Sequence, residues 1–189
     1  MSAEKVYQNE FLPVAKYLLK ELEYYGENQF KRKTDASDWT IGQLYHHLVQ
    51  GTIEQHFKAI RECIDQKNGS SKGGKSIFGF FVFLFGAYPA AKMKGVPGYF
   101  PTQIENTAKA KDMMFGFIKE MQKIAGEIDK NKGTTYKVKH RKLGRLTAKE
   151  WYKLIAMHQK HHLKQKHRID KILRTFNKDE VYSDSTAIV

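Results

Sequence analysis

The sequence predicts an all-α protein, an antiparallel four-helix bundle with a long crossover between its second and third helices. Two observations carry this prediction. Four long stretches repeat apolar residues at the spacing of one helix face. Three of these stretches begin with a capping box, in which a Thr and a Glu or Gln three residues later satisfy the first N–H groups of a helix. We expect a short apolar helix in the crossover and little room for a sheet.

The first two helices are predicted at residues 4–25 and 41–66. The first carries an apolar stripe and ends before Gly26. Thr40 and Gln43 form the capping box of the second helix, preceded by a tryptophan at the position where a hydrophobic residue packs on the first turn. The apolar stripes consist of Val6, Phe11, Val14, Leu18, Leu19 and Leu22, and of Leu44, Leu48, Ile53, Phe57 and Ile60.

The crossover begins with a loop rich in Gly, Ser and Lys and continues into the Phe-rich run at residues 77–91. This run is too short to span a bilayer and contains a proline. We therefore expect a helix that is buried, that caps the end of the bundle or that forms a dimer contact. Thr102 and Glu105 form the second capping box, which opens a third helix through Ile128.

The fourth helix follows a basic loop at residues 133–145, in which residues 136–138 form at most a short extended piece. Thr147 and Glu150 supply the third capping box. The apolar stripe of this helix continues as far as Leu173.

Length and composition fit a single domain at residues 1–176, followed by a polar, flexible tail at residues 177–189. The single cysteine, Cys63, cannot form an internal disulfide and indicates a reducing compartment. The sequence has neither a secretion signal nor an apolar span of membrane length. We expect a cytoplasmic protein with no membrane partner.

The formal net charge of +13 is concentrated in one part of the chain. Residues 130–174 contain 15 Lys or Arg against two acidic residues. Such a region can attract nucleic acid, an anionic membrane or an anionic small molecule. No zinc finger, RNP-type sequence or coiled-coil repeat accompanies it, so nucleic acid is the less favoured partner.

Histidines of the fourth helix carry the strongest functional signal. His158 and His162 lie about 40° apart around the helix axis, inside its apolar stripe. Two imidazoles one turn apart on a rigid helix can chelate a divalent cation. A third ligand must come from another helix, where His46, His47 and His56 are available and periodicity does not choose among them. The stripe consists of Trp151, Ile155, Ile169, Ile172 and Leu173.

Two short motifs are formed by Trp39-Thr40-Ile41 with His47-Leu48, and by Met157-His158-Gln159-Lys160-His161-His162-Leu163. In these motifs, and in the order of helices and caps over most of the chain, the sequence resembles the DinB/YfiT-like superfamily, small four-helix bundles in which three histidines hold a metal. The resemblance implies His47, His158 and His162 as the ligands. One departure is Gly51, where some members carry an acidic residue.

Three neutral imidazoles with one open coordination position are typical of a catalytic metal site. Zinc, nickel, iron and copper all accept such ligands. A bound metal lowers the pKa of a water to about 7, and it also deprotonates a thiol. The resemblance implies both kinds of chemistry, because relatives include thiol-dependent transferases and isomerases.

Two further features bear on the reaction. Arg141, Lys142 and Arg145 could attract the carboxylates of a low-molecular-weight thiol cosubstrate. Glu54 follows His47 by two helical turns on the same face and is a candidate general base.

The sequence therefore predicts a metal-dependent enzyme of the DinB-like class, which binds one divalent metal and acts on a small molecule by thiol-dependent transfer or hydrolysis. The alternative is a non-catalytic metal- or nucleic-acid-binding stress-response protein. A homodimer is compatible with both predictions.

Overall fold

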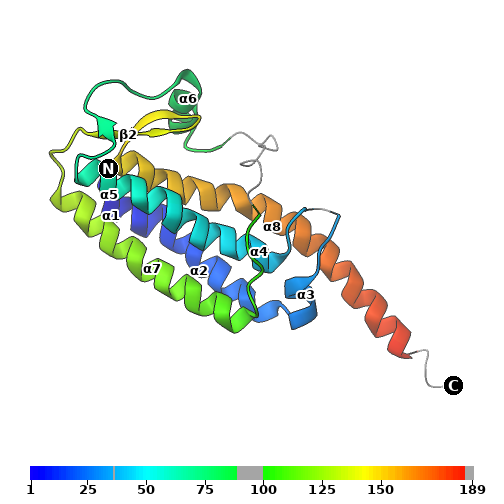
Figure 1. Cartoon of the computed structure of the whole chain (residues 1–189). Coiled ribbons are helices and arrows are strands. Elements are labelled where there is room, and N and C mark those ends of the chain that lie inside the picture. The colour runs from blue at the N-terminus through cyan, green and yellow to red at the C-terminus, as the bar shows by residue number, and fades with distance from the viewer. Residues whose placement is uncertain (36, 89–99, 186–189) are drawn as a thin grey trace.

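The computed structural model describes residues 1–35, 37–88 and 100–185, with residues 177–185 described by their backbone alone. The chain folds into a mainly helical protein with one small antiparallel sheet (Figure 1). In chain order, the elements are α1 (Ala3–Val6), η1 (Tyr7–Phe11), α2 (Leu12–Glu21), η2 (Leu22–Tyr24), α3 (Glu27–Lys31), α4 (Ile41–His46), η3 (His47–Gly51), η4 (Ile53–Phe57), α5 (Lys58–Ile64), β1 (Gly69–Ser70), α6 (Ile77–Phe85), α7 (Thr107–Lys130), β2 (Lys137–His140), β3 (Gly144–Thr147) and α8 (Ala148–Ser185).

The first two predicted helices are continuous helical runs that contain π-helical turns. One run joins α1, η1, α2 and η2, and the other joins α4, η3, η4 and α5. The second begins at the predicted capping box, since Thr40 Oγ1 accepts the N–H of Gln43 at 3.0 Å and Gln43 Oε1 accepts the N–H of Thr40 at 3.1 Å. It ends before Gln66, whose positive φ of 56° cannot continue a helix.

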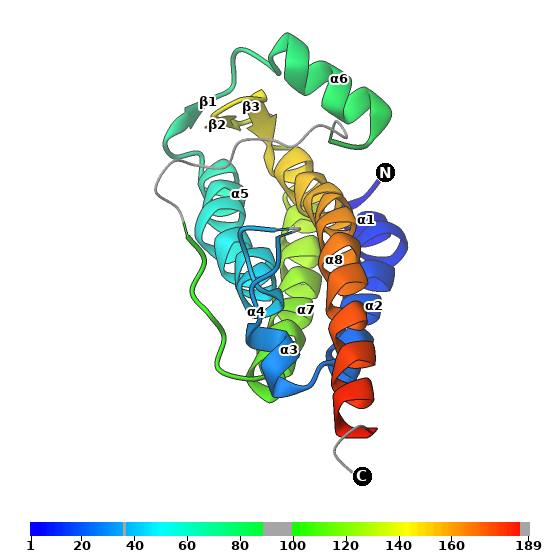
Figure 2. The same ribbon diagram turned by 90° about the vertical axis from the view of Figure 1, so that its right-hand side faces the viewer.

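These two runs, α7 and α8 lie side by side, and the two views of Figures 1 and 2 agree on this arrangement. Their facing sides bury most residues of the predicted apolar stripes, but the prediction is wrong for Ile53, which is 37% exposed. The ring of Phe117 lies 5.4 Å from that of Phe11 and 5.8 Å from that of Phe57, which joins three of the helices through aromatic contacts.

The third helix begins later than predicted, so the proposed cap at Thr102 and Glu105 is wrong. Asn106 is the N-cap of α7, and its side-chain oxygen accepts the N–H of Lys109 at 2.8 Å. An asparagine with this side-chain bond satisfies the free N–H groups at the helix start. The residues before it form a loop.

A three-stranded sheet, ordered β1-β2-β3, adds to the predicted all-α fold. Strand β2 pairs with β3 in the register Val138↔Leu146, and β1 adds Gly69 opposite Val138. Val138 and Leu146 point to the same buried side, which faces the end of α5 and the start of α8. The predicted extended piece at residues 136–138 is therefore one strand of a hairpin.

Helix α6 lies at one end of the molecule (Figure 2), and its first turn packs against the turn between β2 and β3. Ser76 caps it by accepting the N–H of Gly79 at 3.0 Å, and Gly86 ends it with a positive φ of 62°. The predicted run extended to residue 91, and its last part lies outside the described residues. Helix α8 continues to Ser185, beyond the predicted domain end at residue 176.

Candidate metal centre

Three histidines from two helical runs converge: His47 lies at the start of η3, and His158 and His162 lie on α8. The Nε2 atom of His47 lies 3.0 Å from that of His158 and 3.1 Å from that of His162. The Nε2 atoms of His158 and His162 are 3.0 Å apart. Among His46, His47 and His56, the structure therefore brings His47 to the histidine pair of α8, as the resemblance implies.

The three Nε2 atoms form a triangle whose dimensions fit a divalent cation, and we call this cluster the histidine triangle. A tetrahedral zinc about 2.0–2.1 Å from each nitrogen separates its ligand nitrogens by about 3.3 Å. The Nε2 separations are within a few tenths of an ångström of that value. Three nitrogen lone pairs pointing at one place repel each other unless a proton or a cation lies between them.

The tautomer of His162 is fixed by its neighbour. Its Nδ1 atom lies 2.8 Å from Oε1 of Gln165, and an amide oxygen can only accept, so Nδ1 carries the proton. The lone pair is then on Nε2, which faces the other two histidines. Gln165 is held in turn, because its Nε2 donates to Ser37 Oγ at 2.8 Å and Ser37 Oγ accepts the N–H of Trp39 at 3.1 Å.

Burial keeps all three imidazoles in the neutral form that binds metals. Burial, followed by the neighbouring His162, lowers the pKa of His47 to about 3. Burial also lowers the pKa of His162 to about 4 and holds the pKa of His158 well below its usual value. A neutral imidazole can coordinate a metal at neutral pH without first releasing a proton.

Aromatic rings form one wall of the centre. The ring of Trp39 lies 4.8 Å from that of His47 and is stacked on that of His162 at 6.2 Å. A second wall contains His56, whose ring lies 5.8 Å from that of His158 and 5.6 Å from that of Trp151. The Nδ1 atom of His56 and the Nε1 atom of Trp151 are buried and have no hydrogen-bond partner among the described residues.

The second run contains two π-helical turns at and after His47. His47 begins η3, and His56 lies in η4. A π-helical turn inserts an extra residue into a helix and is frequent at functional sites. It shifts the angular positions of all later side chains, so regular helical periodicity could not choose among the three histidines.

Each of the three histidines is half-buried, so the centre is partly accessible to solvent. Glu54, the candidate base, is exposed, and its Oε1 accepts a hydrogen bond from Gln50 Nε2 at 2.9 Å. No described contact joins Glu54 to the three metal-ligand candidates, so its catalytic role stays a prediction.

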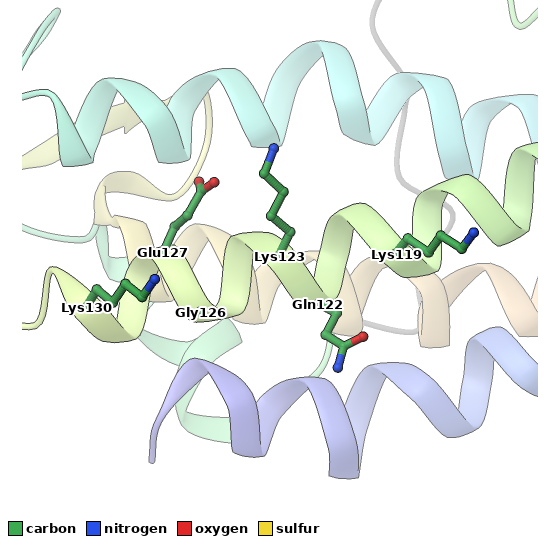
Figure 3. Close-up of a pocket in the computed structure, with 6 residues that line it drawn as sticks. All are labelled: Lys119, Gln122, Lys123, Gly126, Glu127 and Lys130. Atoms are coloured by element: carbon green, nitrogen blue, oxygen red, sulfur yellow. The ribbon is translucent and has the colours of Figure 1, made fainter.

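A separate surface hollow lies on α7 (Figure 3). Its residues are mostly charged, and the three histidines are not among them. The candidate metal centre is therefore the cluster of three histidines, and this hollow is a separate feature. The residues that line it are Lys119, Gln122, Lys123, Gly126, Glu127 and Lys130.

Sequence reasoning missed two residues of the centre, Gln165 and Ser37. Gln165 follows His162 by three residues, a spacing that places two side chains side by side on a helix. That spacing could have identified Gln165 as a neighbour of His162 from the sequence. Ser37 carries no comparable signal, because it lies in the loop before the second run and reaches α8 only through the tertiary fold.

Comparison with known proteins adds no family assignment. No family model, no curated protein and no solved structure matches the chain. Among the helices of the described residues, none combines the length and apolar character needed to cross a membrane.

Proposed function

We propose that this protein is a metal-dependent enzyme of the DinB-like class, built on an antiparallel four-helix bundle, which acts on a small molecule. His47, His158 and His162 hold one divalent metal. The convergence of their three Nε2 atoms within 3.0–3.1 Å carries the proposal. A metal bound there supplies an open coordination position for a water or a thiol, which serves hydrolysis or thiol-dependent transfer.

The residues around the triangle have separate tasks in this proposal. Gln165 holds His162 in the tautomer that presents Nε2. Trp39 covers two of the imidazoles and restricts water on that side. The buried nitrogens of His56 and Trp151 are available to polar atoms of a substrate, because buried polar groups tend to find a partner.

The test is elemental analysis of the purified protein and of His47→Ala, His158→Ala and His162→Ala. We expect about one divalent metal per chain in the native protein and loss of that metal in each variant. His167→Ala is the matched control, since His167 lies on α8 but is exposed and contacts Tyr17. A native protein that takes up no metal after reloading with zinc, nickel or iron would overturn the proposal.

Turnover separates the enzyme from a second candidate, a non-catalytic metal- or nucleic-acid-binding stress-response protein. The 15 basic residues within residues 130–174 favour the nucleic-acid form of this candidate. Metal-loaded protein is assayed on panels of thiol-conjugation, ester and amide substrates. Metal-dependent turnover that is lost in His158→Ala supports the enzyme, whereas salt-dependent retention of nucleic acid without turnover supports the second candidate.

A further inference from the structure

Helix α6 exposes an apolar face that the rest of the described chain leaves uncovered. Ile77, Leu84 and Phe85 are 82%, 62% and 73% exposed, so the predicted alternative of a buried helix is wrong, and a dimer contact stays a prediction. Phe78, Phe80 and Phe81 add to the same exposed surface. A contiguous patch of large apolar side chains on a protein surface marks an interaction site.

The position of α6 is fixed, because its opposite side is held by the β2–β3 hairpin. Gly79 packs directly on the backbone of Leu143, where a side chain at residue 79 would collide with it. Ser76 N donates to Leu143 O at 2.9 Å, and Ser76 Oγ donates to Lys142 O at 2.8 Å. The exposed apolar side chains therefore lie on the side of α6 away from the hairpin, and Figure 2 shows α6 at one end of the molecule.

The surroundings of this face are strongly basic. Residues 66–88 and 130–149, which include α6, the sheet and their loops, contain eleven Lys or Arg and no acidic residue. Lys72, Lys139 and Arg141 are exposed. Acidic residues border these ranges: Lys75 forms an ion pair with Glu150 at the start of α8, and Lys67 lies 4.0 Å from Asp65 at the end of the second run.

The apolar face of α6 and the basic residues around it together indicate which kind of partner can bind there. A symmetric dimer through α6 would bring together two surfaces with a large excess of Lys and Arg, which is electrostatically unfavourable. Nucleic acid would satisfy the Lys and Arg side chains but offers no apolar phase for Ile77 and Leu84. An anionic bilayer offers both, because its acyl boundary takes up apolar side chains and its phosphates attract cations.

We propose that the face formed by α6 and the β2–β3 hairpin docks reversibly on an anionic lipid bilayer. The exposed Phe, Ile and Leu side chains enter the headgroup region, and the exposed Lys and Arg side chains contact lipid phosphates. The contact is peripheral, and it does not depend on the proposed enzymatic function. It replaces the expectation from sequence of a protein without a membrane partner.

The experiment is co-sedimentation of the full chain with two vesicle types. One contains phosphatidylcholine alone, and the other contains about 30% phosphatidylserine. We expect binding to the anionic vesicles at least tenfold stronger than to the neutral ones, weakening steeply with added salt. Leu84→Ser with Phe85→Ser should reduce the binding about tenfold or more, and Lys139→Glu with Arg141→Glu should do the same.

Matched variants of α7 serve as controls. Phe115→Ser removes an aromatic ring that is 51% exposed on another face, and Lys119→Glu with Lys123→Glu reverses two charges there. Both should bind anionic vesicles as the native protein does. Circular dichroism and the unfolding midpoint verify that the α6 variants remain folded, since the replaced side chains are exposed.

Three outcomes overturn the proposal. The first is equal or absent binding of the native protein to the two vesicle types. The second is a dimer in light scattering that Leu84→Ser and Phe85→Ser abolish while vesicles are not bound, which assigns the face to a second copy. The third is nucleic-acid retention that requires Lys139 and Arg141 but not the apolar side chains, again without vesicle binding.

Discussion

The Nδ1–H of His162 donates to Oε1 of Gln165 at 2.8 Å, and this bond leaves the lone pair on Nε2, which faces His47 and His158. Ser37 fixes the amide from its other end. The chain of hydrogen bonds from Ser37 through Gln165 to His162 therefore orients one of the three proposed metal ligands. Such outer partners hold the tautomer of a metal-binding imidazole and raise its basicity.

Gln165→Leu should weaken metal binding about 10–100-fold. Leucine has a similar size but cannot accept the Nδ1–H, so His162 loses both its fixed tautomer and its orientation. Competition with a chromophoric zinc chelator measures the affinity. Gln122→Leu on α7 is the matched control and should leave the affinity unchanged. Equal affinities of the two variants would contradict this role of Gln165.

Lys166 is wholly buried and is the centre of a charged cluster one helical turn beyond His162. Its Nζ lies 2.6 Å from Glu21 Oε2 and 2.7 Å from Asp170 Oδ2. Tyr25 completes the cluster by donating its hydroxyl to Asp170 Oδ1 at 2.5 Å. Burial raises the pKa of Glu21, but the hydrogen bond and charge of Lys166 outweigh this effect and leave that pKa below its usual value.

Lys166→Met should lower the free energy of unfolding by about 3–5 kcal/mol, because it leaves two carboxylates close together without their cation. Adding Glu21→Gln to this variant should recover part of the loss, since one of the two charges is then removed. Urea unfolding measures both values. Lys164→Met, an exposed change on the same helix, should stay within about 0.5 kcal/mol of the native protein. A similarly small effect of Lys166→Met would show that the cluster contributes little.

The features that could be predicted from the sequence are those set by local chemistry. Capping residues and apolar periodicity located the two N-terminal helical runs and the start of α8. The pair His158 and His162 could be predicted because one rigid helix positions both residues. The choice of His47 needed a family resemblance, since the π-helical turns change the angular positions that regular periodicity assumes.

The features that could not be predicted depend on distant partners. Lys166 belongs to a basic segment that resembles a solvated helix face, and its burial depends on Glu21 from another helix. Strand β1 has two residues and forms only because Gly69 meets Val138 of the hairpin. The exposure of α6 also depends on the tertiary fold, because an apolar run has the same sequence pattern whether or not neighbours cover it.

Mild acid should destabilise the hairpin through His140. Its Nδ1 accepts the backbone N–H groups of Lys142 and Leu143, both at 3.1 Å. Burial, followed by the charge of Lys142, lowers the pKa of His140 from 6.5 to about 4. The unfolded chain therefore binds more protons than the folded one between these values, and stability falls as the pH decreases through this window.

His140→Asn should reduce the loss of stability between about pH 7 and about pH 5. The asparagine oxygen can accept an N–H in the same turn and does not titrate. Urea midpoints of the metal-free protein at the two pH values provide the measurement. The other buried histidines keep part of the pH dependence in both proteins, so the smaller difference in the variant is the result that matters. If the loss of stability between the two pH values were the same in His140→Asn as in the native protein, the other buried histidines alone would account for the pH dependence.

Gly144 ties the hairpin to the loop before α6, and its replacement should be costly for two reasons. Its φ of 81° is a conformation that L-residues rarely adopt, and a Cβ there would collide with the backbone of Lys75 and Ser76. We expect Gly144→Ala to lower the free energy of unfolding by about 1–3 kcal/mol. Gly116→Ala lies in α7 with open space around it and should instead add about 0.5–1 kcal/mol. Urea unfolding measures the free energy of unfolding of both variants. If Gly144→Ala also raised it, the backbone at residue 144 would be able to relax, and its close contact with the loop before α6 would not be required for stability.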